Sequence, residues 1–159
     1  MALKKNKEVF YATYYSALYL ERQIRDMGLR SYKTCPKDAT EAIFEYTRQI
    51  LFPDAVSRIS CVFYCETLEE AVQCAMEDWI NCGDKTKEEV KILMVDVDDS
   101  RIARYDQVLY NEAYEAVEHC NFEKAMKLAE NYFAGKQSEN PIFELVSDGT
   151  NKVVKEIEY

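Results

Sequence analysis

Two side chains in otherwise apolar or hydroxyl-rich segments are the best candidates for chemistry in this sequence. Glu144 lies within Ile142–Val146, where an unpaired buried carboxylate would be costly, so it must be paired, exposed or placed at a cleft. Strand alternation offers a structural alternative, in which Glu144 turns outward and its apolar neighbours turn inward.

Arg58 is the second candidate, flanked by hydroxyls in Ser57-Arg-Ile-Ser60. Ser57, Arg58 and Ser60 thus bring a cation and two hydroxyls to the start of a central strand, where they could contribute to a functional site. The structural alternative is a salt bridge from Arg58 to Asp54. Both interpretations stay open from the sequence alone.

The segment Tyr11-Ala-Thr-Tyr-Tyr15 is a third group, with hydroxyls and aromatic faces on an early strand. These side chains form the earliest of the three candidate groups along the chain.

A run of carboxylates at Val95–Asp99 could bind magnesium in a metal-dependent hydrolase, through Asp96, Asp98 and Asp99. No partner motif accompanies the run, so a solvated loop after a strand is the favoured interpretation. The six cysteines form no C-x-x-C pair and His119 is the sole histidine, so no metal is expected. Buried, reduced thiols account better for the cysteines.

Composition limits the classes of partner. The chain has 159 residues and a net charge of −9, which makes nucleic acid an unfavourable ligand. It lacks the ~20-residue apolar stretch that a membrane span needs and has no secretion signal at its start. A cytoplasmic location and no membrane association are therefore expected.

Residue patterns predict an α+β protein with a mixed or antiparallel split sheet and flanking helices, in one domain over 1–159 with a flexible tail at 1–7. The last two strands are expected to form a hairpin through Asp148-Gly149, and Thr67 with Glu70 to form a capping box. The predicted strands are 8–15, 59–65, 89–97, 141–147 and 151–158, and the predicted helices are 16–28, 38–52, 68–79, 105–118 and 122–134.

This layout resembles the ADP-ribosyltransferase-like proteins. The resemblance is carried by the polar and aromatic early strand, the Ser-Arg-x-Ser element, the Leu68-Glu-Glu-Ala71 helix and the late strand with Glu144. The stretch Phe52–Ser60 is also similar to a bacterial family without an assigned activity.

The resemblance implies binding of NAD in a cleft between two small sheets. By position it places Tyr11 and Thr13 at the dinucleotide anchor, Ser57, Arg58 and Ser60 on the second element, and Glu144 as the catalytic carboxylate. The implied function is binding of NAD or another nucleotide, with transferase activity undecided. The alternative is a non-enzymatic acidic interaction protein of a phage or host-regulatory kind, suggested by the acidic body and the 12 tyrosines, a residue type common in protein interfaces.

Overall fold

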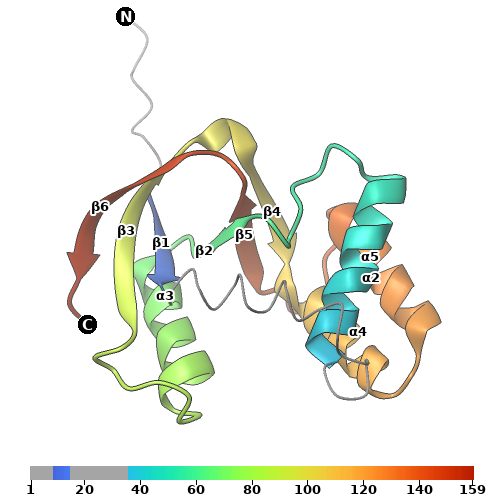
Figure 1. Ribbon diagram of the computed structural model, residues 1–159, viewed down its shortest axis with the longest axis horizontal. Helices are drawn as coiled ribbons and strands as arrows, with labels where there is room; N and C mark the ends of the chain where they lie inside the picture. The colour runs from blue at the N-terminus through green and yellow to red at the C-terminus, as the bar shows by residue number, and fades with distance from the viewer. Residues whose placement is uncertain (1–8, 15–35) are drawn as a thin grey trace, which may run out of the picture. The chain divides into compact units, whose positions relative to one another are not determined.

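The computed structural model describes residues 9–14 and 36–159 (Figure 1). The predicted tail at 1–7 and the predicted helix at 16–28 lie outside these ranges. The chain divides into two compact units, which are described separately, and the prediction of one domain stays a prediction. The described parts of the first unit are 9–14, 63–102 and 149–159, and those of the second are 36–62 and 103–148.

The first unit contains an antiparallel sheet in the order β1-β3-β6, formed by β1 (Val9–Tyr14), β3 (Lys91–Val97) and β6 (Asn151–Ile157). The central strand, β3, is rich in apolar and β-branched residues, a composition that favours a strand with neighbours on both sides. Ile92 and Val95 of this strand are buried, so β3 supplies the apolar anchor of the sheet.

Helix α3 (Leu68–Cys74) begins at the predicted capping box. The Thr67 hydroxyl accepts from the Glu70 backbone N–H, and the Glu70 carboxylate accepts from the Thr67 N–H, each at 3.1 Å. The chain then widens into a π-helix, Ala75–Ile80. Ala71 and Ala75 pack against Val90 and Ile92, because their small side chains let the helix approach the apolar residues of β3 closely.

The second unit contains three helices, α2 (Pro36–Leu51), α4 (Gln107–Glu118) and α5 (Phe122–Phe133). They enclose an aromatic core in which the Phe44 ring contacts Tyr110 and Tyr132 edge-on, at centroid distances of 5.1 and 5.2 Å. Edge-on pairs bring the positive edge of one ring to the negative face of the next. Helix α2 begins at Pro36, two residues before the predicted Asp38, because proline is well tolerated in the first turn of a helix.

A second three-stranded sheet has the order β2-β5-β4, with β2 (Val62–Tyr64), β5 (Phe143–Ser147) and β4 (Ile102–Asp106). Strand β4 was not predicted, since the helix expected from residue 105 overlapped it. Asp106 ends the strand and caps α4 by accepting from the Val108 N–H at 3.0 Å. Because this cap fixes the helix start at Gln107, the two preceding residues belong to the strand.

The predicted hairpin is wrong. Strand β5 lies beside β2 and β4, whereas β6 pairs with β3 in the other sheet. The Asp148–Thr150 link therefore passes from one sheet to the other, and the Asp98 N–H donates to the Thr150 carbonyl at 3.0 Å. The α+β class is confirmed, and the strands form two small sheets.

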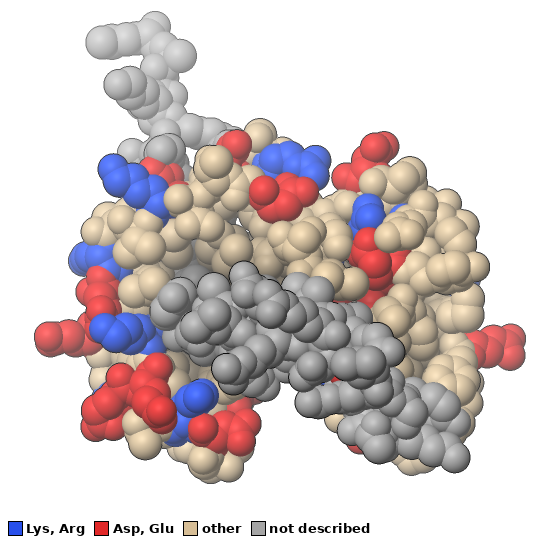
Figure 2. Space-filling model, in the orientation of Figure 1, with Lys and Arg blue, Asp and Glu red and all other residues tan. Residues whose placement is uncertain are grey.

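Surface charge is mixed over the described chain. Acidic and basic side chains are interspersed on the face that Figure 2 draws. Among the described helices, none has the length and apolar composition that a membrane crossing needs.

Candidate functional site

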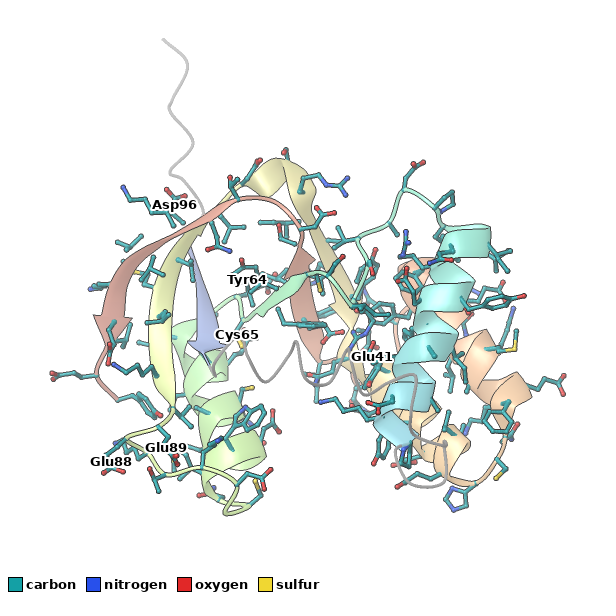
Figure 3. The ribbon with its side chains drawn as sticks, in the orientation of Figure 1. Glu41, Tyr64, Cys65, Glu88, Glu89 and Asp96 are labelled. Atoms are coloured by element: carbon teal, nitrogen blue, oxygen red, sulfur yellow. The ribbon has the colours of Figure 1, made fainter. Side chains whose placement is uncertain are left out.

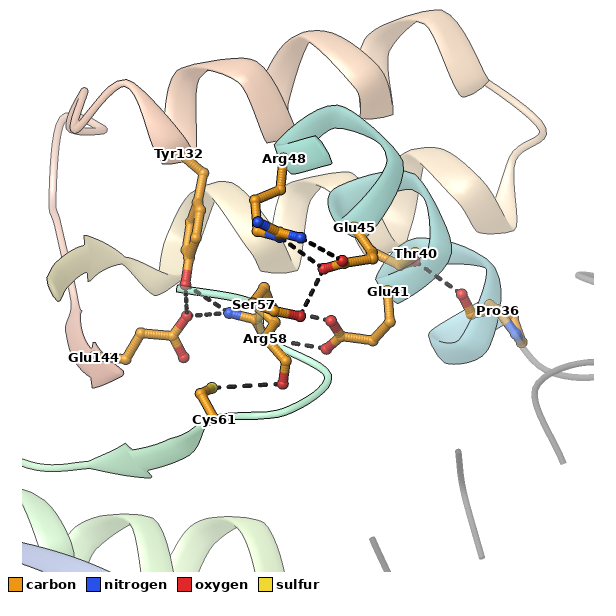
Figure 4. Close-up of polar contacts among 10 residues, drawn as sticks. All are labelled: Pro36, Thr40, Glu41, Glu45, Arg48, Ser57, Arg58, Cys61, Tyr132 and Glu144. Carbon is orange, nitrogen blue, oxygen red and sulfur yellow. Dashed lines mark hydrogen bonds and ion pairs between the residues drawn. The ribbon is translucent and has the colours of Figure 1, made fainter. Parts of the chain in front are cut away.

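Arg58 and Glu144 lie in direct contact within the second unit. The Arg58 Nη1 group donates to Glu144 Oε1, although the two residues are 86 positions apart. The Tyr132 hydroxyl donates to the same oxygen at 2.6 Å and accepts from Arg58 Nη1 at 2.7 Å. Two of the side chains chosen from the sequence therefore meet at one carboxylate oxygen, which α5 also holds through Tyr132 (Figure 4).

Glu41 completes this cluster from helix α2 (Figure 3). Arg58 Nε donates to Glu41 Oε2 at 3.0 Å, and Nη2 donates to Glu41 Oε1 at 3.1 Å. This paired arrangement uses one edge of the planar guanidinium, which is the geometry that suits carboxylate and phosphate. Arg58 thus links α2 to β5 across the unit.

The guanidinium is also enclosed by aromatic rings. Its central carbon lies 4.1 Å from the Tyr110 ring centroid and 5.3 Å from that of Tyr132. A cation over an aromatic face is attracted by the ring quadrupole, most strongly where water is excluded. The rings therefore stabilise a charge that burial would otherwise penalise.

Burial and charge shape the ionisation of the cluster. Burial alone lowers the pKa of Arg58, but the Glu144 and Glu41 carboxylates outweigh it and hold that pKa well above its usual value. Burial raises the pKa of Tyr132, and Glu144 raises it further against the opposing effect of Arg58. Arg58 is therefore charged and Tyr132 neutral, so the tyrosine keeps the proton that it donates to Glu144.

The two oxygens of the Glu144 carboxylate differ in their described contacts. Among the described residues, both hydrogen bonds to this carboxylate fall on Oε1. The Glu144 side chain is 11% exposed, against 6% for Arg58. One oxygen is thus fixed by protein donors, and the other can accept a hydrogen bond from a ligand.

Ser57 belongs to a neighbouring network. Its hydroxyl donates to Glu45 Oε2 at 2.7 Å, and Arg48 donates to both oxygens of the same carboxylate at 2.8 and 3.0 Å. Burial alone would raise the pKa of Glu45, but the hydrogen bonds from Arg48 and Ser57 lower it to about 2. Arg48 also donates to the carbonyls of Pro53 and Ala55, so this network fixes the loop that delivers Arg58.

The remaining predicted site residues are Ser60, Tyr11 and Thr13. Ser60 is exposed, and its N–H donates to the Ser57 carbonyl in a turn. Tyr11 and Thr13 lie on β1 opposite Met94 and Ile92, in the first unit, and their side chains are outside the described part of the chain. The second unit therefore supplies Arg58 and Glu144, with Ser57 beside them.

Both structural alternatives drawn from the sequence need correction. Glu144 does not turn outward, because Arg58 and Tyr132 supply buried partners for its carboxylate. Arg58 forms its ion pairs with Glu41 and Glu144, where the sequence suggested Asp54. Sequence inspection missed Glu41, Tyr110 and Tyr132, which sit in helical stripes with no local sign of a distant arginine.

The second unit also has a surface hollow of about 430 Å³ beside the cluster. It is lined by Lys37, Tyr110, Asn111, Tyr114, Glu115 and Glu118. Tyr110 belongs to both places, since its ring faces the Arg58 guanidinium. This volume lies within the range of ordinary small-ligand sites.

The acidic run at residues 95–99 is the candidate magnesium site of the sequence analysis, with a solvated loop as the favoured alternative. Asp96 is part of β3 (Figure 3), and the Asp98 carboxylate accepts from the Ser100 N–H and hydroxyl at 3.0 and 2.7 Å. Across the residues that the structure describes, no group of three or more histidine, cysteine, aspartate or glutamate side chains is arranged to hold a metal ion.

Comparison with known proteins places this chain in a family. The family model described as "Protein of unknown function (DUF2441)" matches residues 2–159. The chain belongs to this DUF2441 family. No curated protein matches the chain significantly.

Proposed function

We propose that the chain is an ADP-ribosyltransferase-like protein that binds NAD or another nucleotide at the Arg58–Glu144 cluster. The observation that carries the proposal is the shared contact of these two residues at Glu144 Oε1. The resemblance requires an anion-binding side chain and a late-strand carboxylate to act on one ligand, and distant segments of this chain bring such a pair together.

The architecture supports the same proposal at a coarser level. The resemblance implies a core of two small sheets, and the chain has two three-stranded sheets. Strand β5 carries Glu144 in one sheet, and β1 carries Tyr11 and Thr13 in the other. The predicted site residues are thus divided along the sequence between an early strand and a late strand.

The chemistry proposed for Glu144 follows from its hydrogen bonds. Arg58 and Tyr132 hold Oε1, which leaves Oε2 as the oxygen that a ligand would contact. A ribose hydroxyl could donate to Oε2, and the negative charge would stabilise positive charge that develops on the sugar when a nicotinamide bond breaks. Arg58 would hold a phosphate, and Tyr114 in the hollow offers a ring for stacking.

Calorimetric titration with NAD, alongside an NAD-consumption assay, tests the proposal. Wild type should bind NAD, and Glu144→Gln should lose turnover by at least about 100-fold if Glu144 stabilises the transition state. Glu156→Gln is the matched control, since Glu156 is a half-exposed strand residue that pairs with Lys91 on the surface. Binding without turnover in wild type would leave a nucleotide-binding module, and absence of NAD binding would reject the proposal.

A protein partner is the second candidate function, favoured by an apolar face on α2. Tyr46, Ile50 and Leu51 are each more than half exposed and follow one another at helical spacing. Figure 2 shows broad uncharged areas over the helices of this unit. If this face binds a protein, the Ile50→Lys variant should lose partners that wild type captures at low salt, whereas equal capture by both would count against it.

A further inference from the structure

The Arg58 guanidinium presents two edges, and each has a different occupant. The Nε and Nη2 groups form one edge, which Glu41 accepts with both oxygens at 3.0 and 3.1 Å. Nη1 serves Glu144 and Tyr132 instead. Glu41 can therefore leave without breaking the contact that orients Glu144 (Figure 4).

The edge that Glu41 occupies is the one suited to a phosphate. Two parallel N–H groups of arginine bind two oxygens of a carboxylate or a phosphate with nearly the same geometry. Glu41 thus takes the place that a nucleotide phosphate would need if Arg58 were its anchor.

The charges of the cluster indicate that the Glu41 carboxylate and a bound phosphate exclude each other. The cluster already holds two carboxylates against one guanidinium. A phosphate added beside Glu41 would bring a third anion to a single buried cation, and like charges at this range repel strongly where water is scarce. Removal of the Glu41 charge would leave Arg58 and Glu144 as a balanced pair.

The exposed fractions of the side chains indicate that a ligand would reach Arg58 from the side that Glu41 occupies. The Glu41 side chain is 17% exposed, against 6% for Arg58. The Tyr110 ring faces the guanidinium. Burial raises the pKa of the Tyr110 hydroxyl, and the Glu41 carboxylate raises it further. Tyr110 also lines the hollow, as does Lys37. Tyr110 is therefore shared between the aromatic face of the guanidinium and this hollow, which Glu115 and Glu118 line together with Lys37.

We propose that Glu41 makes an autoinhibitory contact, in which its carboxylate occupies the phosphate-binding edge of Arg58 until a nucleotide phosphate displaces it. The proposal rests on the proposed function and adds regulation to the same site. It assigns Arg58 two states, one bound to Glu41 and one bound to phosphate, with the Glu144 contact kept in both.

Calorimetric titrations with NAD and with inorganic pyrophosphate test this contact in wild type, Glu41→Gln and Glu130→Gln. Glu130 is the matched control, because it is a helix glutamate of the same unit that pairs with Lys127 in an exposed, separate contact on α5. Glu41→Gln should bind both probes about tenfold more tightly than wild type, since one repelling charge is gone. Glu130→Gln should bind as wild type does, and Glu41→Gln/Arg58→Lys should lose the gain, because lysine lacks the paired donors.

The outcomes separate this inference from the function on which it rests. Equal NAD binding by wild type and a folded Glu41→Gln would overturn the autoinhibitory contact and leave the nucleotide proposal standing. Tighter pyrophosphate binding by Glu41→Gln, with no NAD binding by any variant, would support the contact and reject NAD as the ligand. Failure of every variant to bind either probe would reject both, and thermal unfolding of each variant would verify that it is folded.

Discussion

Tyr132 and Arg58 donate to the same oxygen of Glu144, and Tyr132 also accepts from Arg58 at 2.7 Å. The three side chains come from α5, from the loop before β2, and from β5. A buried carboxylate normally demands a charged partner, and here it has a cation and a neutral donor on one atom. This triangle fixes the late strand against the helical layer and gives Glu144 a single orientation.

Loss of the Tyr132 hydroxyl should destabilise the protein. Tyr132→Phe keeps the ring among its aromatic neighbours and removes one donor to Glu144, so the free energy of unfolding should fall by about 1–3 kcal/mol. Urea unfolding followed by fluorescence measures the change. Tyr46→Phe is the control, because Tyr46 is largely exposed, and an equal loss in both variants would contradict a special role for the buried hydroxyl.

Glu45 should make the protein sensitive to acid over a defined range. Its pKa is lowered from 4.5 to about 2 in the folded state, so the ionised group contributes stability above pH 4.5. That contribution disappears as the pH falls from 4.5 towards about 2, because the unfolded state takes up the proton first. Between pH 5 and pH 2 the melting temperature of Glu45→Gln should fall less than that of wild type, and parallel curves would disprove the assignment.

Cys61 should be unreactive at ordinary pH. Burial raises the pKa of its thiol to about 12, with Arg58 acting in the opposite direction, and alkylation requires the thiolate. Mass spectrometry after brief iodoacetamide treatment at pH 8 should find label on the exposed Cys82 and Cys120 and none on Cys61. Labelling of Cys61 at a similar rate would show that the core around Arg58 opens readily.

The capping box should set the stability of the first turn of α3. Thr67→Ala removes the oxygen that accepts from the Glu70 N–H, at an expected cost of about 1 kcal/mol in the free energy of unfolding. Thr67→Ser retains an acceptor and serves as the conservative control. A thermal melt in which both variants unfold with wild type would show that the box contributes little to stability.

Elements with strong local signals were predicted well. The capping box before α3, helix α5 over the predicted 122–134 and the apolar strand β3 appear where the sequence indicated. Each depends on residues within a few positions of one another, so local propensity and hydrogen bonding are sufficient to define it. The order of the described elements as far as β3 followed from the same signals.

Strand pairing and side-chain contacts between segments far apart in the sequence were predicted only in part. The Asp148-Gly149 turn favoured a hairpin, yet β6 joins β3 and β5 lies beside β2 and β4. The sequence singled out Arg58 and Glu144. No residue near Glu41 or Tyr132 in the sequence indicates that these two side chains are their partners. A glutamate on a helix face is normally solvated, and only the approach of α2 to the Arg58 loop gives Glu41 its role.

Sequence by itself determined the α+β class, most element positions and the two side chains whose burial would demand an explanation, because these depend on short-range patterns of polarity and capping. Tertiary structure alone decided which strands share a sheet, and that one guanidinium serves Glu41, Glu144 and Tyr132 together. Such choices depend on the free energy of burying charges and apolar surface between segments far apart in the chain, which no short stretch of residues encodes.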